Sequence, residues 1–363
     1  MEPYVPIVPF DVLSERLGRR PEDIVKLDAN ENPYGPSPRV RQALAAAAYL
    51  HIYPDPQSGA LRQALAAYTG VPAAHLLAGA GADELIDLVL RAVLRPGDAV
   101  LNCPPSFGMY PFSTAVNMGR LVAVSRRDDF ALDLDAIHTA LAANPRARVL
   151  FICSPNNPDG SVVSAPDLRR LLQLPIIVVL DEAYVEFGGE SCITWVQQHE
   201  NLIVLRTFSK WAGLAGLRVG YGAFPLWLMP HLWKIKQPYN VNVAAAQAAI
   251  SALQDEEWSR THIQALIAER RRLQQALSEF PFLQSLPSQA NFVLFRVTGL
   301  DAARLKQDLE QEGILVRYFD KPGLQNCIRV SAGRPQDTDR LLAALHKVTE
   351  ANRLPHARKK DLP

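Results

Sequence analysis

Residues 205–221, LRTFSKWAGLAGLRVGY, carry one lysine in a place where a solubilising charge is unusual. The apolar run just before it, residues 202–205 (LIVL), predicts a short buried strand. Lys210 therefore stands between a buried strand and a turn rich in glycine and alanine. A desolvated lysine loses its proton more readily than an exposed one, and it then becomes a nucleophile that can form a Schiff base.

Two neighbours of Lys210 suit a phosphate group. Ser209 supplies a hydroxyl and Arg218 supplies a permanent cation. A small molecule that carries both an aldehyde and a phosphate is pyridoxal 5'-phosphate, so this stretch predicts that cofactor with Lys210 as its anchor. A single lysine after a strand is more often an exposed loop residue, and the choice between the two interpretations depends on the rest of the chain.

Apolar runs alternate with helical patterns through the first two thirds of the chain. Strands are predicted at residues 75–78, 99–102, 121–124, 148–153, 176–181, 202–206 and 219–223, and helices at 82–94, 107–117, 134–143 and 165–172. Continuous apolar runs such as IIVVL at 176–180 are typical of strands that are buried on both faces. The pattern predicts an α/β fold with a mostly parallel seven-stranded sheet flanked by helices. Ligands of such sheets bind at the carboxyl ends of the strands.

The pattern changes after a long predicted helix at residues 243–280. Strands at 291–297, 314–318 and 327–331 and helices at 301–312 and 336–349 predict a smaller α+β domain, which the N-terminal strand 24–27 should complete. We therefore expect a large domain at 30–260 and a small domain made of 1–29 and 261–363. Two further helices are predicted at 38–49 and 58–68, the second capped by Ser58.

Composition excludes several classes of protein. The 363 residues include 38 basic and 37 acidic side chains, so the chain lacks the positive charge of a protein that binds nucleic acid or an anionic membrane. The four cysteines are scattered without the spacing of a metal site, and they suit the reducing cytoplasm. No stretch approaches the roughly 20 apolar residues of a membrane span, and no signal peptide is predicted.

Polar clusters directly follow several predicted strands. In GAGADE (79–84), Ala82 and Asp83 open a helix whose free amides suit a phosphate, although an ordinary strand-to-helix turn is the alternative. In PPSFGMY (104–110), the Tyr110 ring would either stack on a flat cofactor or pack in the core.

Two more clusters supply hydrogen-bonding groups. In SPNNP (154–158), Asn157 is suited to a phenolic oxygen, the two X-Pro bonds are compatible with a cis peptide, and a plain turn is the alternative. Asp181 ends the most apolar strand, where a desolvated carboxylate needs a partner. A protonated pyridine nitrogen would serve, and the protonated ring is the electron sink for a carbanion; the alternative is a helix N-cap. Arg317 and Arg329 lie in C-terminal strands and are either solvent-facing or a clamp for an anionic substrate.

Together these motifs resemble the fold-type-I aminotransferases that use pyridoxal phosphate. SPNNP, DEAY (181–184), SK (209–210) and GLR (216–218) mark that superfamily as an ordered set. DANENPYG (28–35), YPD (53–55), GAGADELI (79–86) and LRTFSK (205–210) are similar to its histidinol-phosphate branch. The resemblance extends from residue 26 to residue 331.

The resemblance implies a role for each matching residue. Lys210 would bind the cofactor covalently and shuttle a proton, with Asp181 on the pyridine nitrogen and Tyr110 on the ring face. Asn157 and Tyr184 would hold the phenolic oxygen. The phosphate would be bound by Ala82, Asp83, Ser209 and Arg218, and by Tyr53 of a partner subunit. This last role implies a homodimer with shared active sites. The substrate would be bound by Arg329, Arg317 and Asn30.

The implied reaction moves an amino group between L-histidinol phosphate and 2-oxoglutarate in L-histidine biosynthesis. It gives imidazole-acetol phosphate and L-glutamate. An aromatic amino acid aminotransferase of the same branch and a threonine-phosphate decarboxylase remain as alternatives. The chain departs from the pattern at Phe10, Phe107 and Asp159, where many relatives have tyrosine, tyrosine and threonine.

Overall fold

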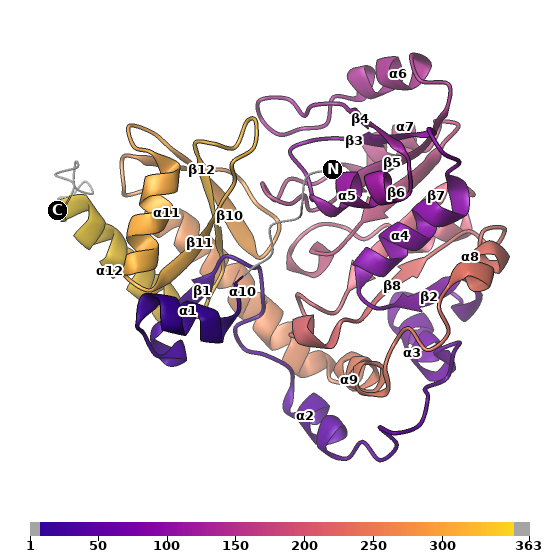
Figure 1. Cartoon of the computed structure of the whole chain (residues 1–363), viewed down its shortest axis with the longest axis horizontal. Helices are drawn as coiled ribbons and strands as arrows, with labels where there is room; N and C mark the ends of the chain where they lie inside the picture. The colour runs from indigo at the N-terminus through magenta and orange to yellow at the C-terminus, as the bar shows by residue number, and fades with distance from the viewer. Residues whose placement is uncertain (1–7, 352–363) are drawn as a thin grey trace.

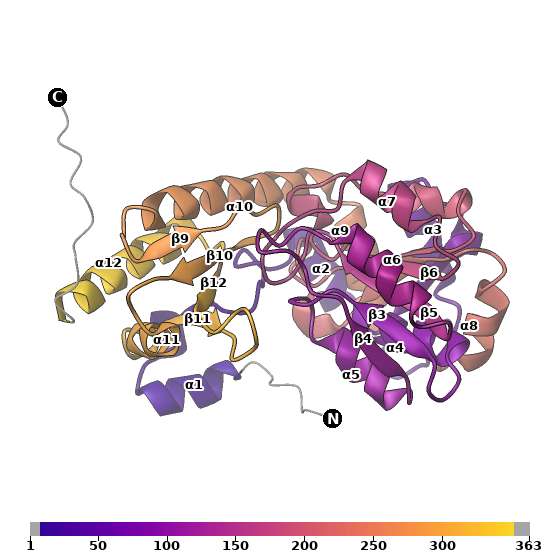
Figure 2. The same ribbon diagram turned by 90° about the horizontal axis from the view of Figure 1, so that it is seen from above.

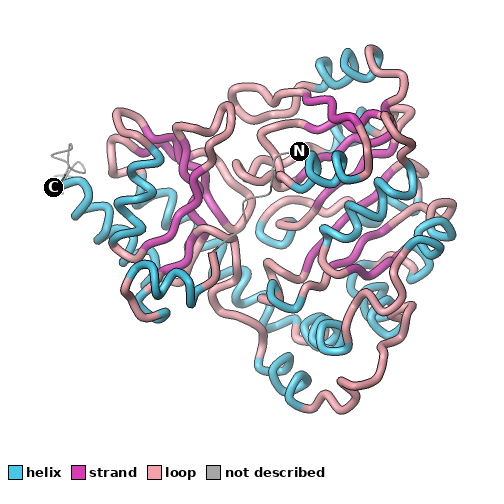
Figure 3. The backbone as a smooth tube through the Cα atoms, in the orientation of Figure 1, coloured by secondary structure: helices cyan, strands magenta, loops and turns pink. Residues whose placement is uncertain are grey.

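The computed structural model describes residues 8–351. The strands form two separate sheets, one large and one small, drawn in magenta in Figure 3. The large sheet has seven strands in the order β2-β8-β7-β6-β5-β3-β4. The pairs formed by β3, β4, β5, β6 and β7 are parallel, and β8 runs antiparallel to both of its neighbours. The prediction of a mostly parallel seven-stranded sheet is confirmed. The bounds are β2 Leu76–Gly79, β3 Ala99–Asn102, β4 Arg120–Ala123, β5 Ala147–Cys153, β6 Ile177–Asp181, β7 Leu202–Thr207 and β8 Gly220–Ala223.

Helices cover both faces of the large sheet (Figure 1). Val179 and Leu205 point into a core layer shared with α4, α5 and α8, whereas Val178 and Val204 point into a second layer shared with α3, α6, α7 and α9. Since successive strand residues point to opposite faces, two covered faces explain why the central strands read as uninterrupted apolar runs. The helix bounds are α2 Pro38–Ala45, α3 Gly59–Thr69, α4 Ala82–Val93, α5 Met109–Val116, α6 Leu134–Ala142, α7 Ala165–Leu171, α8 Met229–Ile235 and α9 Val243–Leu253.

The small sheet has five strands in the order β1-β11-β12-β10-β9. Its N-terminal strand pairs in parallel with β11, which places residues 25–27 in one sheet with the C-terminal strands. The domain limits at residues 30 and 260 stay a prediction. The bounds of the small lobe are α1 Phe10–Leu17, β1 Val25–Leu27, α10 Glu256–Leu277, β9 Leu283–Ser285, β10 Phe292–Val297, α11 Ala302–Gln311, β11 Ile314–Tyr318, β12 Cys327–Ser331 and α12 Pro335–Ala351.

The single helix predicted at residues 243–280 is two helices, α9 and α10. The chain leaves helical geometry at Asp255, where φ is −112° and ψ is 60°. The alanine-rich α9 is buried against the large sheet, and α10 then extends toward the small sheet (Figure 2). A change of direction between two packed surfaces therefore ended the helix, which the helical periodicity of the sequence does not reveal. The short elements α8 and β9 were not predicted either.

The cap of α3 differs from the prediction. Ser58 is the residue before the helix, but its backbone is left-handed (φ 49°) and its side chain makes no capping hydrogen bond. The Asp55 carboxylate takes that role, accepting from the amides of Gln57 (2.9 Å) and Gly59 (2.6 Å). An aspartate three residues upstream reaches these amides because the chain turns tightly after Pro54. Within residues 8–351, no helix combines the length and apolar character needed to cross a bilayer.

Candidate active site

Three predicted site residues lie at the carboxyl ends of adjacent strands. Asn157 follows β5, Asp181 ends β6, and Lys210 follows β7. The three strands pair in parallel, and Asp181 is in register with Cys153 on one side and Leu205 on the other. The polar side chains that follow these strands therefore gather at one edge of the large sheet, as predicted.

Lys210 points its amine at the segment that connects β1 to the large lobe. Its Nζ donates to the carbonyl oxygen of Ala29 (3.0 Å) and lies 5.9 Å from the ring centroid of Tyr184. Burial lowers the pKa of the Lys210 amine, the nearby Arg329 cation acts in the same direction, and the resulting value is about 8. A much larger fraction of the amine is therefore neutral near pH 7 than for an exposed lysine, as a nucleophile requires.

Asp181 is a buried carboxylate with two neutral hydrogen-bond donors. Its Oδ2 accepts from the Tyr110 hydroxyl (2.7 Å) and its Oδ1 from the Ala183 amide (3.1 Å). Burial raises the pKa of Asp181 to about 6. In the described part of the chain, no lysine, arginine or histidine forms an ion pair with this carboxylate. A cationic ring nitrogen would supply the missing charge and hold the carboxylate ionised.

Tyr110 is fully buried, and its contacts differ from those of a residue that faces a cofactor. Its ring stacks on Phe151 (centroids 4.6 Å apart, planes 7° apart) and meets the edge of Phe107 (5.6 Å). Burial raises the pKa of its phenol, so the hydroxyl stays a donor to Asp181. Stacking of Tyr110 on a cofactor ring stays a prediction. Phe107, which the sequence analysis named only as a departure, is half-buried and is a second aromatic ring at this edge.

Asn30 and Tyr184 form one hydrogen-bonded unit. The Asn30 side-chain amide donates to the Tyr184 hydroxyl (3.1 Å). Asn30 has a left-handed backbone (φ 56°), which Ser331 and Asn291 hold in place. The Ser331 hydroxyl accepts from the backbone amide of Asn30 and donates to its side-chain oxygen. The Asn291 side chain donates to the backbone carbonyl oxygen of Asn30 (3.0 Å). Ser331 in β12 and Asn291 just before β10 thus orient the Asn30 side chain, which bonds to Tyr184 beyond the end of β6.

Arg329 joins the same group from β12. Its NH1 donates to Oδ1 of Asn157 (2.5 Å) and its NH2 to the carbonyl oxygen of Asp28 (2.6 Å). The guanidinium lies over the rings of Phe292 (5.1 Å) and Phe319 (5.5 Å). Arg317 is in register with Arg329 on the paired strand β11, so both start from one face of the small sheet. Two cations opposite each other are unfavourable unless an anion lies between them.

Two of the residues predicted to hold a phosphate, Asp83 and Arg218, meet at the start of α4. Gly81 precedes the helix with φ 82° and contributes no side-chain cap, which leaves the first amides of α4 available. Arg218 donates to Oδ2 of Asp83 (3.1 Å), and a Cβ at Gly81 would lie 2.5 Å from its NH2. Gly220, which is in register with Thr207, lies against the Ala82 amide.

Thr207 is a residue to which the sequence analysis gave no role. Its hydroxyl lies 2.9 Å from that of Ser209 and accepts from the Ser209 amide (3.1 Å), so it shapes the turn that leads to Lys210. The signal was present in the sequence, because Thr207 belongs to the polar cluster that ends β7.

Tyr53 is the one predicted cofactor residue that stands apart. Tyr53 is 79% exposed, and its ring stacks on that of Tyr239 with the centroids 4.6 Å apart. Its predicted role in the site of a partner subunit stays a prediction.

The departures at Phe10 and Asp159 have different surroundings. Phe10 lines a cavity of about 490 Å³ whose wall also includes Ser209 and Arg334. Asp159 is buried and accepts from the Asn156 side chain and from the Ser161 amide (2.8 Å). Asp159 therefore holds the loop that carries Asn157.

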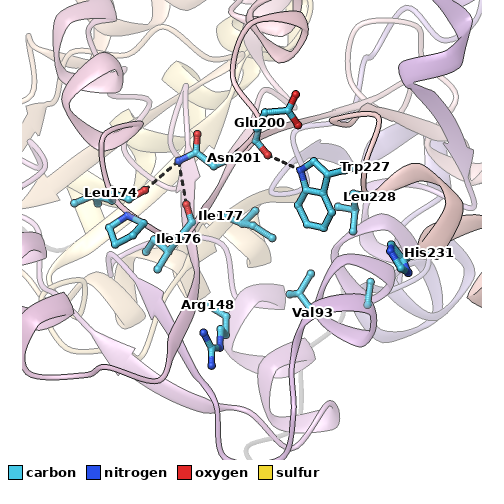
Figure 4. Close-up of a pocket in the computed structure, with 12 residues that line it drawn as sticks. Val93, Arg148, Leu174, Ile176, Ile177, Glu200, Asn201, Trp227, Leu228 and His231 are labelled. Atoms are coloured by element: carbon cyan, nitrogen blue, oxygen red, sulfur yellow. Dashed lines mark hydrogen bonds between the residues drawn. The ribbon is translucent and has the colours of Figure 1, made fainter.

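A second cavity, of about 610 Å³, lies at the opposite edge of the large sheet. Figure 4 shows it between Trp227, His231 and Arg148, with the Trp227 indole donating to the carbonyl oxygen of Glu200 (2.8 Å). None of the predicted site residues lines it. Among the described residues there is also no group of three side chains arranged to hold a metal ion.

Known proteins are similar to this chain in sequence and in fold. The sequence profile of aminotransferase class I and II matches residues 22–345. The chain belongs to this aminotransferase family. Histidinol-phosphate aminotransferase of Nicotiana tabacum, a chloroplastic protein, is 54% identical to this aminotransferase over 347 residues, which is 95% of this chain and 84% of the relative. The enzyme of that name from Roseiflexus castenholzii is 51% identical over 96% of each chain.

The fold is similar to that of a solved relative. Histidinol-phosphate aminotransferase from Sinorhizobium meliloti, determined in complex with pyridoxal 5'-phosphate, superposes with a TM-score of 0.88. That protein is 31% identical to this aminotransferase, and the match covers 96% of both chains. The fold-type-I architecture predicted from the sequence is therefore confirmed.

Proposed function

We propose that this chain is a histidinol-phosphate aminotransferase that uses pyridoxal 5'-phosphate. It transfers an amino group between L-histidinol phosphate and 2-oxoglutarate, in L-histidine biosynthesis. The observation that carries the proposal is that a Lys210 amine, whose burial lowers its pKa to about 8, and a buried Asp181 carboxylate come from the ends of adjacent strands. The substrate is supported by the two relatives of that name, at 51% and 54% identity.

The donor set fits the cofactor. When bound, pyridoxal phosphate supplies an electron-withdrawing ring that stabilises negative charge on the substrate carbon. Lys210 supplies the amine that anchors the cofactor and later moves a proton. Asp181 keeps the ring nitrogen protonated, and Asn157 and Tyr184 are the donors for its phenolic oxygen. The first amides of α4, with Ser209 and Arg218, suit the phosphate.

Two guanidinium groups account for the two substrates. Arg329 is oriented by Asn157 and by the carbonyl oxygen of Asp28, and Arg317 starts from the same face of the small sheet. The pair suits the carboxylate of glutamate in one half of the reaction and the phosphate of histidinol phosphate in the other. Asn30 borders the same space through its bond to Tyr184.

We also infer a homodimer with shared active sites in a reducing compartment such as the cytoplasm. Tyr53 belongs to a group of exposed apolar side chains, which also includes Tyr49, Leu50, Ile52 and Tyr239. Exposed apolar groups of this kind often mark protein interfaces. All four cysteines are free and buried, as expected where disulfides do not form. Sedimentation of the purified protein as a monomer at micromolar concentration would contradict the dimer.

The deciding experiment compares wild type, Lys210→Ala and the surface variant Lys347→Ala. We expect Lys347→Ala to convert histidinol phosphate and 2-oxoglutarate at the wild-type rate, and Lys210→Ala to be inactive and to bind the cofactor without a covalent bond. Wild-type turnover by Lys210→Ala overturns the proposal. Parallel assays with phenylalanine and with threonine phosphate test the substrate, since preferential transamination of the first or carbon dioxide release from the second overturns it.

A further inference from the structure

A buried ion cluster lies next to the end of β6, which carries Asp181, and next to the end of β7, which leads to Lys210. It consists of Glu182, which follows β6, Arg206 in β7, and Glu186 in the short 3-10 helix η3 (Val185–Phe187). Tyr221, in register with Arg206 on β8, belongs to the core layer on this face, whereas Tyr110 belongs to the layer on the other face. The cluster thus faces away from the contacts of Tyr110 with Asp181.

Glu182 has a full set of partners. Its Oε2 accepts from Nε of Arg206 (3.0 Å) and from the Ser191 hydroxyl (2.8 Å), and its Oε1 from the Cys192 amide (2.6 Å). Its own amide donates to the carbonyl oxygen of Leu205 (2.8 Å). Glu182 therefore links β6 to β7 through both its backbone and its side chain.

Glu186 has much poorer partners. Its carboxylate lies 3.7 Å from NH1 of Arg206, and within residues 8–351 neither oxygen has a hydrogen-bond partner. Burial raises the pKa of Glu186 to about 7, and the attraction of Arg206 only partly opposes this. A buried carboxylate with one distant cation, and with its own backbone amide as the nearby donor, is costly when it is ionised.

Within residues 8–351, the other groups around Glu186 supply no second positive charge close to it. Tyr221 accepts from NH1 of Arg206 (3.3 Å), and Tyr68 of α3 and Glu182 are the remaining titratable neighbours. Arg270 of α10 is turned to the backbone, because its NH1 donates to the carbonyl oxygens of Phe187 (3.2 Å) and Ala290 (2.8 Å). One guanidinium, that of Arg206, thus faces two carboxylates.

We propose that Arg206 is a positioning residue of this aminotransferase. By binding Glu182, it fixes the end of β6 that carries Asp181 against the end of β7 that leads to Lys210. When Glu186 is protonated, Arg206 is paired with Glu182 alone. When Glu186 loses that proton, it becomes a second anion that competes for the same guanidinium. Arg206 and Glu186 do not touch the substrate; they affect the reaction through the positions of Asp181 and Lys210. This inference rests on the proposed function only for its activity readouts.

The test uses Arg206→Met, Arg206→Lys, Glu182→Gln and Glu186→Gln in the full chain. Hydrogen exchange of the cofactor-free protein reads the strand ends directly, and the absorbance of the bound cofactor between pH 5 and 9 gives the protonation midpoint at Lys210. We expect faster exchange at residues 178–184 and 204–210 in Arg206→Met. We also expect a shifted midpoint and a kcat lower by roughly 10- to 100-fold with a smaller change in KM. Arg206→Lys should restore part of each.

Glu186→Gln tests the proton-dependent part. At pH 6, the hydrogen exchange and kcat of this variant should match those of wild type. At pH 8.5, the variant should exchange more slowly than wild type, because glutamine cannot ionise and compete for Arg206. Wild-type exchange, midpoint and kcat in Arg206→Met overturn the proposal. If Arg206→Met does not fold, wild-type exchange, midpoint and kcat in both Arg206→Lys and Glu182→Gln overturn the proposal instead. If the wild-type protein has no transaminase activity, the proposed function is overturned. The hydrogen-exchange result then decides the positioning role of Arg206 by itself.

Discussion

NH1 of Arg329 donates a 2.5 Å hydrogen bond to Oδ1 of Asn157, and this bond joins the small sheet to the carboxyl edge of the large one. The two residues are 172 positions apart in the chain. Asn157 was predicted to bind the cofactor and Arg329 to bind substrate. The bond therefore joins a residue predicted to bind the cofactor to a residue predicted to bind substrate, so binding of the two small molecules should be coupled.

Replacing Arg329 with lysine should lower kcat/KM for both glutamate and histidinol phosphate by about 100-fold. Lysine keeps the charge but cannot bond Asn157, the carbonyl oxygen of Asp28 and a substrate anion in one plane. Loss of such a buried, charged contact costs about 3 kcal/mol. Steady-state kinetics with each substrate measure the effect. Arg304→Lys, on an exposed arginine of α11, should behave as wild type, and equal kinetics for the two variants would contradict the role of Arg329.

The Lys210 amine should react with pyridoxal phosphate in a pH-dependent manner that reflects its pKa of about 8. Only the neutral amine is a nucleophile, so the rate of covalent attachment to cofactor-free protein should rise with pH and level off above pH 8 to 9. Stopped-flow absorbance from pH 6 to 10 measures this rate. Arg329→Met removes a nearby positive charge, which should move the midpoint to higher pH. A midpoint near the ordinary lysine value of about 10.4 would show that Lys210 is not desolvated.

The large sheet and the strand-end residues could be predicted from the sequence because both depend on local patterns. Continuous apolar runs specify strands covered on both faces, and the polar residues that end them fall on one edge by topology alone. Asn157, Asp181 and Lys210 were predicted in this way, and the structure places them at or just after the ends of three adjacent strands.

Contacts between distant segments could not be predicted in the same way. The hydroxyl of Tyr110, which lies in α5, reaches Asp181 at the end of β6, and no spacing in the sequence encodes that contact. The turn between α9 and α10 and the role of Asp55 depend on where the chain must change direction. The two carboxylates around Arg206 were likewise hidden, since DEAY was interpreted through Asp181 and Tyr184 alone.

Tyr110→Phe should weaken Asp181 as a partner for a cationic ring. The variant removes one of two hydrogen bonds to the ionised carboxylate, so the pKa of Asp181 should rise above its value of about 6 and less of it would be ionised at pH 7. A hydrogen bond to a charged group contributes about 1.5 kcal/mol, which corresponds to roughly tenfold in kcat/KM and in the Kd for pyridoxal phosphate.

The pH–rate profile separates this explanation from simple loss of packing. The acid limb of kcat/KM should move to higher pH in Tyr110→Phe, whereas a packing defect would lower the whole profile evenly. Tyr68→Phe, which alters another tyrosine of the large lobe, should leave the limb in place. An unchanged limb in both variants would mean that Tyr110 does not control the ionisation of Asp181.

Asp55→Ala should destabilise the protein by about 1 kcal/mol at pH 7, the usual effect of losing a helix cap. The amides of Gly59 and Gln57 lower the pKa of the Asp55 carboxylate in the folded state. Its contribution is therefore present above the unfolded value of about 3.9 and is lost as the pH falls through the lower folded value. Urea unfolding at pH 7 and at pH 3 should thus give a difference from wild type at the first pH and a smaller one at the second. Ser58→Ala is the matched control, because the Ser58 side chain caps nothing, and a larger loss for Ser58→Ala than for Asp55→Ala would return the cap to Ser58.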